Sequence, residues 1–209
     1  IPGRTGTQLL PEDLGLLARH YPNVATVKEA TGNLDNMRRT RACCGPDFTI
    51  LSGDDPMTVQ MMTDPQINAA GVISVASNVA PGAVARMVRL LLDGKPAEAR
   101  SLAAALEPLF NLVTVKTVEK TPYGEAACRA RNPLAYKTLM AVLGMPSGGC
   151  KPPLGKMTRN GLKTVIEAAR SVQRAAPEIL QPVAEFFGVN IEERLENPKH
   201  REGLYYPEY

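Results

Sequence analysis

Three short apolar runs dominate the pattern of hydrophobic and polar positions in the first part of the chain. They occupy residues 24–28, 48–52 and 71–75, and each is rich in β-branched residues and too short for a helix. The longer mixed stretches between them leave room for one helix in each gap. Strands that alternate with helices are typical of βα units around a parallel sheet. The sequence therefore predicts an α/β fold with three parallel strands in this region.

Proline, glycine and acidic residues indicate where the helices begin and end. Pro11, followed by two acidic residues, is typical of a first helical turn, and Leu14, Leu17 and Ala18 then share one apolar face. A helix is expected after each strand. The expected starts are at 32–35, Pro56 and Pro81, and the last of these helices should run to 92 and stop at 93–94.

Strand signals disappear after residue 95, and helical patterns continue over 97–106 and 162–175. We therefore expect a mostly helical C-terminal region, with a Gly- and Pro-rich loop or linker at 144–153. The last segment carries mixed charge and late tyrosines, which suggests an arm that packs on a neighbour or is disordered. The predicted domains are 1–95 for the βα units, 96–180 for the helical region and 181–209 for the arm.

Composition and charge exclude several classes of function. The net charge of the 209 residues is only +3 and the basic residues are scattered, so nothing favours a nucleic-acid partner. No apolar run approaches the roughly 20 residues of a membrane span, and no secretory signal is recognisable. We expect a cytoplasmic protein without a membrane or nucleic-acid partner. A small anionic substrate remains compatible.

The cysteines and histidines give no sign of a metal site. Cys43, Cys44, Cys128 and Cys150 lack C-x-x-C spacing, and the chain has only two histidines. The adjacent pair lies in a helix-like segment, where partly buried free thiols are the simpler interpretation. No metal is therefore expected.

Candidate chemistry lies where the three predicted strands end, because parallel α/β folds bind ligands at the carboxyl ends of their strands. Lys28 ends the first strand, 53–55 follow the second, and 73–78 follow the third. A lysine buried at such a place loses part of its preference for the charged form, which makes it a candidate nucleophile toward a keto group. Without further observations, a lysine whose ammonium simply reaches solvent is the commoner interpretation.

Four separated motifs favour the nucleophilic lysine over one whose ammonium simply reaches solvent. They are Val-Lys-Glu-Ala-Thr-Gly-Asn-Leu at 27–34, Leu-Ser-Gly-Asp-Asp at 51–55, Gly-Val-Ile-Ser-Val-Ala-Ser-Asn-Val at 71–79 and Ile-Pro-Gly-Arg-Thr-Gly at 1–6. In order and spacing they resemble the dihydrodipicolinate synthase family of Schiff-base-forming, class I aldolases, from residue 1 to about 110. The resemblance implies the C-terminal half of a (β/α)8 barrel followed by a helical region.

The resemblance also implies roles for individual residues. Lys28 would form a Schiff base with pyruvate, so no cofactor is expected, and Arg4 would grip the carboxylate of aspartate semialdehyde. Gly53 and Ile73 would offer backbone groups to the bound pyruvate. Taken singly, Gly53 is more simply a turn glycine and Ile73 a core isoleucine, while Arg4 could equally be a surface arginine. Asp54 and Asp55 are adjacent and diverge, so we expect one of them to cap the next helix.

The chain also departs from the family pattern. Asn-Pro-Leu-Ala-Tyr-Lys at 132–137 resembles the family, but 113–131 is longer and different. The family's catalytic tyrosine precedes the loop that opens this chain, so the chain looks like half of a barrel. Alternatives are a sister aldolase, such as an N-acetylneuraminate lyase or a sugar-acid aldolase, and an inactive half-barrel binding module, whose long exposed strand edges would favour aggregation. A homotetramer is implied by the resemblance only.

Overall fold

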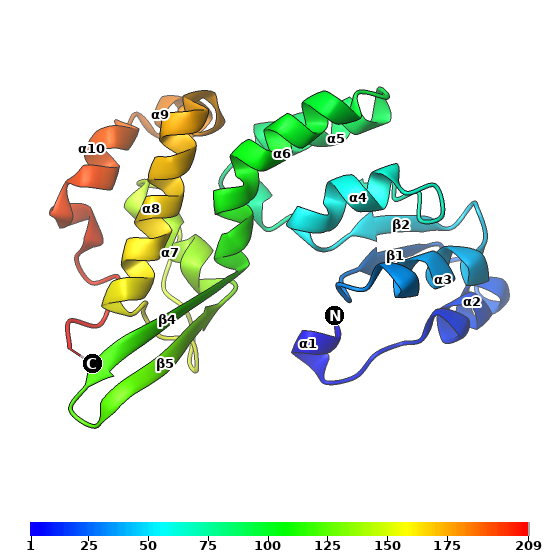
Figure 1. The fold of residues 1–209 in the computed structure, drawn as a ribbon, viewed down its shortest axis with the longest axis horizontal. Helices are drawn as coiled ribbons and strands as arrows, with labels where there is room; N and C mark the ends of the chain where they lie inside the picture. Colours follow the sequence, from blue (N-terminus) through cyan, green and yellow to red (C-terminus); the bar gives the residue numbers. More distant parts are fainter. Residues whose placement is uncertain (209) are drawn as a thin grey trace. The chain divides into compact units, whose positions relative to one another are not determined.

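The computed structural model describes residues 1–208, which form two compact units (Figure 1). Unit 1 contains 1–74 and 85–103, and unit 2 contains 75–84 and the chain from 104 onward. One boundary follows residue 74, and the other two fall within α5 (Pro81–Leu92) and α6 (Pro96–Phe110), whose starts and approximate extents agree with the sequence pattern. The domain limits suggested by the sequence stay predictions.

Unit 1 is built on a parallel sheet in the order β1–β2–β3. Its strands are β1 (Thr26–Glu29), β2 (Thr49–Ser52) and β3 (Gly71–Val72), so the three predicted strands and their parallel arrangement are confirmed. β3 ends earlier than predicted. Beyond it, a single hydrogen bond from the Ile73 N–H to the Ser52 carbonyl, 2.8 Å long, continues the pairing.

Helices connect the strands of unit 1, as the helix-capping and helix-breaking residues of the sequence predict. Asn33 begins α3, because its Oδ1 accepts hydrogen bonds from the backbone N–H groups of Asp35 (3.0 Å) and Asn36 (3.1 Å). Gly45 ends the same helix with a φ of 86°, a conformation that favours glycine. The helical elements of this unit before α5 are α1 (Pro2–Thr5), α2 (Pro11–His20), α3 (Leu34–Cys44), η1 (Asp55–Met57) and α4 (Thr58–Thr63).

The core of unit 1 lies between the sheet and helices α2, α3 and α4. α2 and α3 pack closely, because Gly15 lets the backbone at Cys43 approach. A methyl group added at Gly15 would lie 2.7 Å from the Cys43 carbonyl oxygen. The predicted apolar face of α2 contributes Leu14 directly and Ala18 at its margin. The buried members of the core are Leu14, Met37, Phe48, Ile50, Met61, Ile67 and Ala69.

Arg41, near the end of α3, holds the chain where it enters β2 and β3. Its Nε donates to the Ile67 carbonyl (2.9 Å), and one terminal nitrogen donates to the Asn68 carbonyl (3.1 Å). The other terminal nitrogen donates to three carbonyls ahead of β2, among them that of Phe48 (2.6 Å). The guanidinium group therefore fixes the amino ends of two strands relative to α3.

Unit 2 contains an antiparallel hairpin, β4 (Thr114–Thr121) and β5 (Gly124–Arg131), where the sequence predicts mostly helix. That prediction is wrong for 114–131. The inner face of the hairpin carries Glu119, which is 5 % exposed and accepts hydrogen bonds from Thr117 (2.9 Å) and Asn160 (2.8 Å). A buried carboxylate on the inner face hides the alternation of apolar and polar residues by which a strand is recognised.

The remaining elements of unit 2 pack around its longest helix, α8. α8 contacts β4, α7 and α10, and Thr158 caps its first turn by accepting a hydrogen bond from the Gly161 N–H at 2.9 Å. The predicted loop at 144–153 contains no helix or strand. The elements after the hairpin are α7 (Leu134–Val142), α8 (Arg159–Ala175), η4 (Pro177–Ile179), α9 (Gln181–Phe187), α10 (Ile191–Glu196) and η5 (Pro198–Arg201), and those before it are η2 (Ala76–Asn78) and η3 (Asn111–Val113).

The segment after 180 folds onto its own unit, so the prediction of an arm on a neighbour or a disordered tail is wrong for 181–208. Ile191 and Leu195 of α10 are buried, and Arg194 donates to the carbonyls of Val142 (2.6 Å) and Ala141 (2.8 Å) at the end of α7. A bridge between Met157 and Tyr205 ties the last residues to the start of α8. The sequence pattern could not show this, because these partners lie far apart along the chain.

Two glycine substitutions test the close packing of α2 on α3. Gly15→Ala should lower the free energy of unfolding, although alanine is the better helix former by about 1 kcal/mol, because a backbone oxygen has little freedom to move away from the added methyl group. Gly82→Ala in α5 is the matched control, since nothing lies within 4 Å of the added methyl group. It should leave the protein unchanged or slightly more stable. Urea unfolding of both variants measures the difference, and equal effects would contradict the packing argument.

Candidate active site

The carboxyl ends of the three strands of unit 1 are aligned by backbone hydrogen bonds. Lys28 is paired with Leu51 in the parallel register, and the Gly53 N–H donates to the Glu29 carbonyl at 2.7 Å. The Ile73 N–H continues the same pattern from β3 to β2. Three of the predicted site residues therefore lie together at the carboxyl ends of the strands. They are Lys28, Gly53 and Ile73.

Gly53 and the side chain of Lys28 are in direct contact. A methyl group added at Gly53 would lie 2.7 Å from the Ala30 Cβ and 2.9 Å from the Lys28 Cε. The family resemblance implies that this glycine offers its backbone to the bound pyruvate. The structure shows a close approach by the lysine itself, so Gly53 is needed for the aliphatic part of Lys28 to cross the turn after β2.

Lys28 is exposed, and the expectation that it is buried is wrong for the described residues. The reason is the extent of the sheet. A closed (β/α)8 barrel surrounds its lumen with eight strands, whereas unit 1 contributes three. No hydrogen bond or ion pair of the Lys28 amine occurs among residues 1–208, so the amine is available to a ligand there.

Glu29, the residue after Lys28, fixes the turn that follows β1. Glu29 is only 6 % exposed, and its Oε1 accepts a hydrogen bond from the Thr31 N–H at 2.7 Å. Oε2 accepts one from Asn36 in α3 at 3.2 Å, and Asn36 in turn accepts one from Gln8 at 3.1 Å. Sequence reasoning missed this role, although a carboxylate between a strand-end lysine and a threonine was a visible signal for a polar turn.

Hydroxyl groups hold the turn after β2. The Ser52 hydroxyl donates to the Asp54 carbonyl at 2.9 Å, and the Thr58 hydroxyl lies 3.1 Å from Ser52 Oγ. Asp54 occupies the position before η1, but its side chain makes no capping hydrogen bond, so the predicted cap is wrong for Asp54. Sequence reasoning missed Ser52 and Thr58 as the residues that shape this turn.

The carboxyl of Asp54 has a raised pKa. Partial burial is the largest cause, and the nearby carboxylates of Glu29 and Asp55 add to it. Lys28 acts in the opposite direction, which places its ammonium within electrostatic reach of Asp54. The site therefore combines one amine with three carboxylates at the same strand ends.

A small cavity adjoins Lys28. Its volume is about 100 Å³, and it is lined by Lys28 and Thr31 on one side and by Ile1, Pro2 and residues 7–9 on the other. This space is large enough to hold water or a small ligand. Arg4 belongs to the same N-terminal segment, but it is exposed and does not line this cavity.

The backbone groups at Gly53 and Ile73 are partly used by the sheet. Both N–H groups donate to neighbouring strands, whereas no hydrogen bond to either carbonyl occurs within the described chain. These two positions can therefore offer a ligand hydrogen-bond acceptors. Ile73 is 45 % exposed, so the alternative of a core isoleucine does not hold in unit 1.

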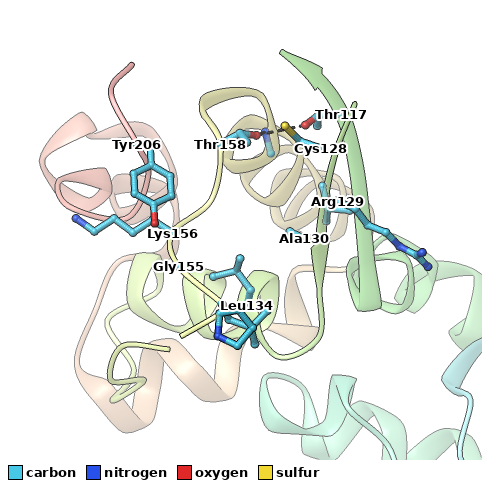
Figure 2. A pocket seen from close by; sticks show the side chains of 13 residues that line it. Thr117, Cys128, Arg129, Ala130, Leu134, Gly155, Lys156, Thr158 and Tyr206 are labelled. Carbon is cyan, nitrogen blue, oxygen red and sulfur yellow. Dashed lines mark hydrogen bonds between the residues drawn. The ribbon is translucent and has the colours of Figure 1, made fainter. Parts of the chain in front are cut away.

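A larger cavity lies in unit 2, at residues that no pattern in the sequence singles out. Its volume is about 320 Å³, and its walls come from the inner face of the hairpin, the 153–158 segment and Tyr206. Figure 2 shows the hydrogen-bonded hydroxyls of Thr117 and Thr158, 3.3 Å apart, at one end of it. The side chains of Arg129 and Lys156 extend away from its interior (Figure 2). It lacks a convergent set of charged groups and is the weaker candidate for an active site.

Neither a metal centre nor a membrane span is found in residues 1–208. No three side chains among His, Cys, Asp and Glu gather there as a metal site would require. The four cysteines are free and partly buried, as expected for the pair at 43–44. None of the described helices has the length and apolar character to cross a bilayer.

Parallel βα units with a lysine and a glycine turn in contact at the strand ends place this chain in the class of parallel α/β folds that gather a candidate site at the carboxyl ends of their strands. The comparison with protein families gives the particular class. Residues 1–172 match the Dihydrodipicolinate synthetase family, and the chain belongs to that family.

Curated relatives carry the same name. The chain is 38 % identical over 145 residues to the 4-hydroxy-tetrahydrodipicolinate synthase of Persephonella marina, covering 69 % of this chain and 44 % of that protein. It is 34 % identical over 171 residues to the enzyme of Sulfurihydrogenibium sp., covering 81 % and 53 %. The chain thus spans about half the length of the curated relatives it matches.

Solved structures confirm the predicted fold class, part of a (β/α)8 barrel with a helix-rich C-terminal region. The 4-hydroxy-tetrahydrodipicolinate synthase of Methylacidiphilum fumariolicum SolV has a TM-score of 0.72 at 30 % identity, covering 90 % of this chain and 55 % of that one. The synthase of Cyanidioschyzon merolae, solved with lysine bound, has a TM-score of 0.70 at 31 % identity, covering 82 % and 52 %.

The raised pKa of Asp54 predicts how stability depends on pH. Folding strengthens proton binding to Asp54, so its contribution is most favourable below the ordinary pKa of about 3.8 and is lost as pH rises through the higher folded value. Asp54→Asn removes the ionisation and should raise the unfolding midpoint at pH 7 but not at about pH 3. Thermal unfolding at both pH values measures this. A stabilisation of equal size at the two values would contradict the assigned cause.

Proposed function

We propose that Lys28 forms a Schiff base with pyruvate, and that the protein condenses the bound pyruvate with L-aspartate 4-semialdehyde. The product would be 4-hydroxy-tetrahydrodipicolinate, a precursor of diaminopimelate and lysine. The observation that carries the proposal is the contact between Lys28 and Gly53 at aligned strand ends, in a chain that matches the family over 1–172.

The lysine supplies the chemistry without a separate cofactor. Its neutral amine adds to the keto carbon of pyruvate, and the adduct takes up a proton and loses water to give an iminium ion. The iminium group draws electrons from the adjacent methyl carbon, which loses a proton to a base and becomes an enamine. The enamine carbon then forms a bond to the aldehyde carbon of the second substrate, and the aldehyde oxygen takes up a proton. The amino group of the semialdehyde part finally attacks the iminium carbon, which closes the ring as the lysine amine leaves.

The groups around Lys28 suit particular steps of this chemistry. The carbonyls of Gly53 and Ile73 are acceptors, so they fit the N–H of an iminium ion better than they fit a carboxylate. Arg4 can hold the carboxylate of the semialdehyde in a bidentate way, because its guanidinium presents paired donors. Its exposed position next to the cavity segment leaves it free to do so.

We also propose the remaining features that the family resemblance implies. They are a cytoplasmic location, a homotetramer, and a proton-transferring tyrosine contributed by sequence outside this chain. The chain covers about half of its curated relatives, so the chemistry of the pyruvate-bound lysine is assigned to this chain and the proton relay is not. No contact in either unit favours the sister aldolases or an inactive module.

Borohydride reduction tests the role of Lys28. With pyruvate present, the whole protein should gain one reduced pyruvyl group, and peptide mass mapping should place it on Lys28. Lys28→Arg should abolish the adduct because arginine stays protonated and forms no Schiff base. Lys95→Arg is the control, since Lys95 is an equally exposed lysine outside the strand ends. An adduct that persists in Lys28→Arg would refute the mechanism.

Arg4 is expected to act on the aldehyde rather than on pyruvate. Arg4→Ala should reduce kcat/KM for the semialdehyde by roughly 10- to 150-fold, the equivalent of one charge-assisted hydrogen bond of about 1.5–3 kcal/mol. Pyruvate trapping at Lys28 should stay normal. Arg86→Ala, at an exposed arginine of α5, should change neither quantity. Loss of trapping in a folded Arg4→Ala variant would overturn the assignment.

A further inference from the structure

One edge of the hairpin in unit 2 has three outward-facing residues whose backbone groups have no hydrogen-bond partner among residues 1–208. The ladder continues beyond the strands with a hydrogen bond from the Asn132 N–H to the Val113 carbonyl, 2.9 Å long. Opposite residues in an antiparallel pair alternate between bonded and non-bonded pairs. Counting back from Val113 and Asn132, the backbone groups of Glu125, Ala127 and Arg129 point away from β4.

The two edges of the hairpin differ in protection. On β4, the Val118 carbonyl accepts a hydrogen bond from Asn160 of α8 at 3.3 Å, and α8 packs against the strand. On β5, no backbone group of 125–130 bonds to any described residue outside β4. β5 also has an unbroken register and no proline in 124–131, so two common obstacles to pairing, a bulge and a proline, are absent from this strand.

The outer face of the hairpin carries an unfavourable charge pair. Lys116 and Arg129 lie directly opposite each other, and both are exposed. Like charges in opposite positions destabilise a sheet. Figure 2 shows the Arg129 side chain directed away from the cavity, on the outer face. On the same face of β5, Glu125 lies four residues before Arg129, with Ala127 midway between them.

We infer that β5 pairs with β5 of a second copy of this chain, antiparallel and about a two-fold axis at Ala127. In this register Glu125 lies opposite Arg129 of the second copy, and Arg129 lies opposite its Glu125. The three residues with outward backbone groups then face one another as hydrogen-bonded pairs. The two hairpins become one sheet of four strands.

The charge order of β5 selects a second copy as the partner. An antiparallel two-fold pairing of identical strands brings together positions equally distant from the axis, and here these positions carry opposite charges. The new neighbour of Arg129 is a carboxylate, which offsets the repulsion from Lys116. The small side chains of Ala126, Ala127 and Cys128 leave the centre of the edge open to close approach.

Cross-linking of the whole protein tests the register. The test uses a background in which all four native cysteines are replaced by serine. With Ala127→Cys added, two copies of the chain should be joined in high yield by a thiol linker shorter than two strand spacings. The two Cα atoms would be about 5.5 Å apart. Val118→Cys is the matched control, because Val118 is opposite Ala127 on the same exposed face. Its copies would be three strand spacings apart, about 14 Å, and should not be joined.

Charge reversal tests the pairing itself. In the Ala127→Cys background, Glu125→Arg or Arg129→Glu alone places like charges opposite each other and should weaken the association at this edge by roughly tenfold or more, which lowers the cross-linking yield. The double variant restores opposite charges and should restore the yield. Failure of Ala127→Cys to cross-link, equal yield from Val118→Cys, or a double variant no better than the single ones would each overturn the proposal.

Discussion

The candidate site depends on the hydrogen bonds that the buried carboxylate of Glu29 accepts. This carboxylate binds the Thr31 N–H and the Asn36 amide, while the Glu29 carbonyl receives the Gly53 N–H. One residue therefore links the end of β1, the turn after it, α3 and the turn after β2. A carboxylate taken out of water needs such compensating hydrogen bonds. Because Lys28 is its neighbour in the chain, the position of the amine relative to Gly53 follows from this linkage.

The opposite end of the same sheet is held by a cation. Arg41 binds backbone carbonyls just before β2 and β3, and the apolar core around Ile50 lies between these two polar anchors. Hydrogen bonds therefore hold both ends of the sheet in position. Such positioning matters because a nucleophilic amine is effective only when the acceptors and charges near it are already in place.

In unit 2, contacts between residues distant in the sequence hold the other elements against one helix, α8. Arg194 binds the end of α7, the bridge at Met157 and Tyr205 fastens the last residues, and Asn160 connects α8 to the hairpin. This packing protects one edge of the hairpin and leaves the other open. The proposed self-association therefore arises from the segment in which the sequence departs from the family pattern.

The three strands, the helix starts at Pro11, Asn33 and Pro81, and the family can be predicted from the sequence, because these depend on short-range periodicity, capping and motifs that each occupy a few neighbouring residues. Lys28 and Gly53 can likewise be recognised as residues at strand ends. The hairpin at 114–131 and the docking of 181–208 are seen only in the folded chain. The tertiary structure alone shows the exposure of Lys28, the Glu29 linkage and the reason for Gly53. Each of these depends on contacts between segments distant in the chain, which local patterns of hydrophobic and polar residues do not encode.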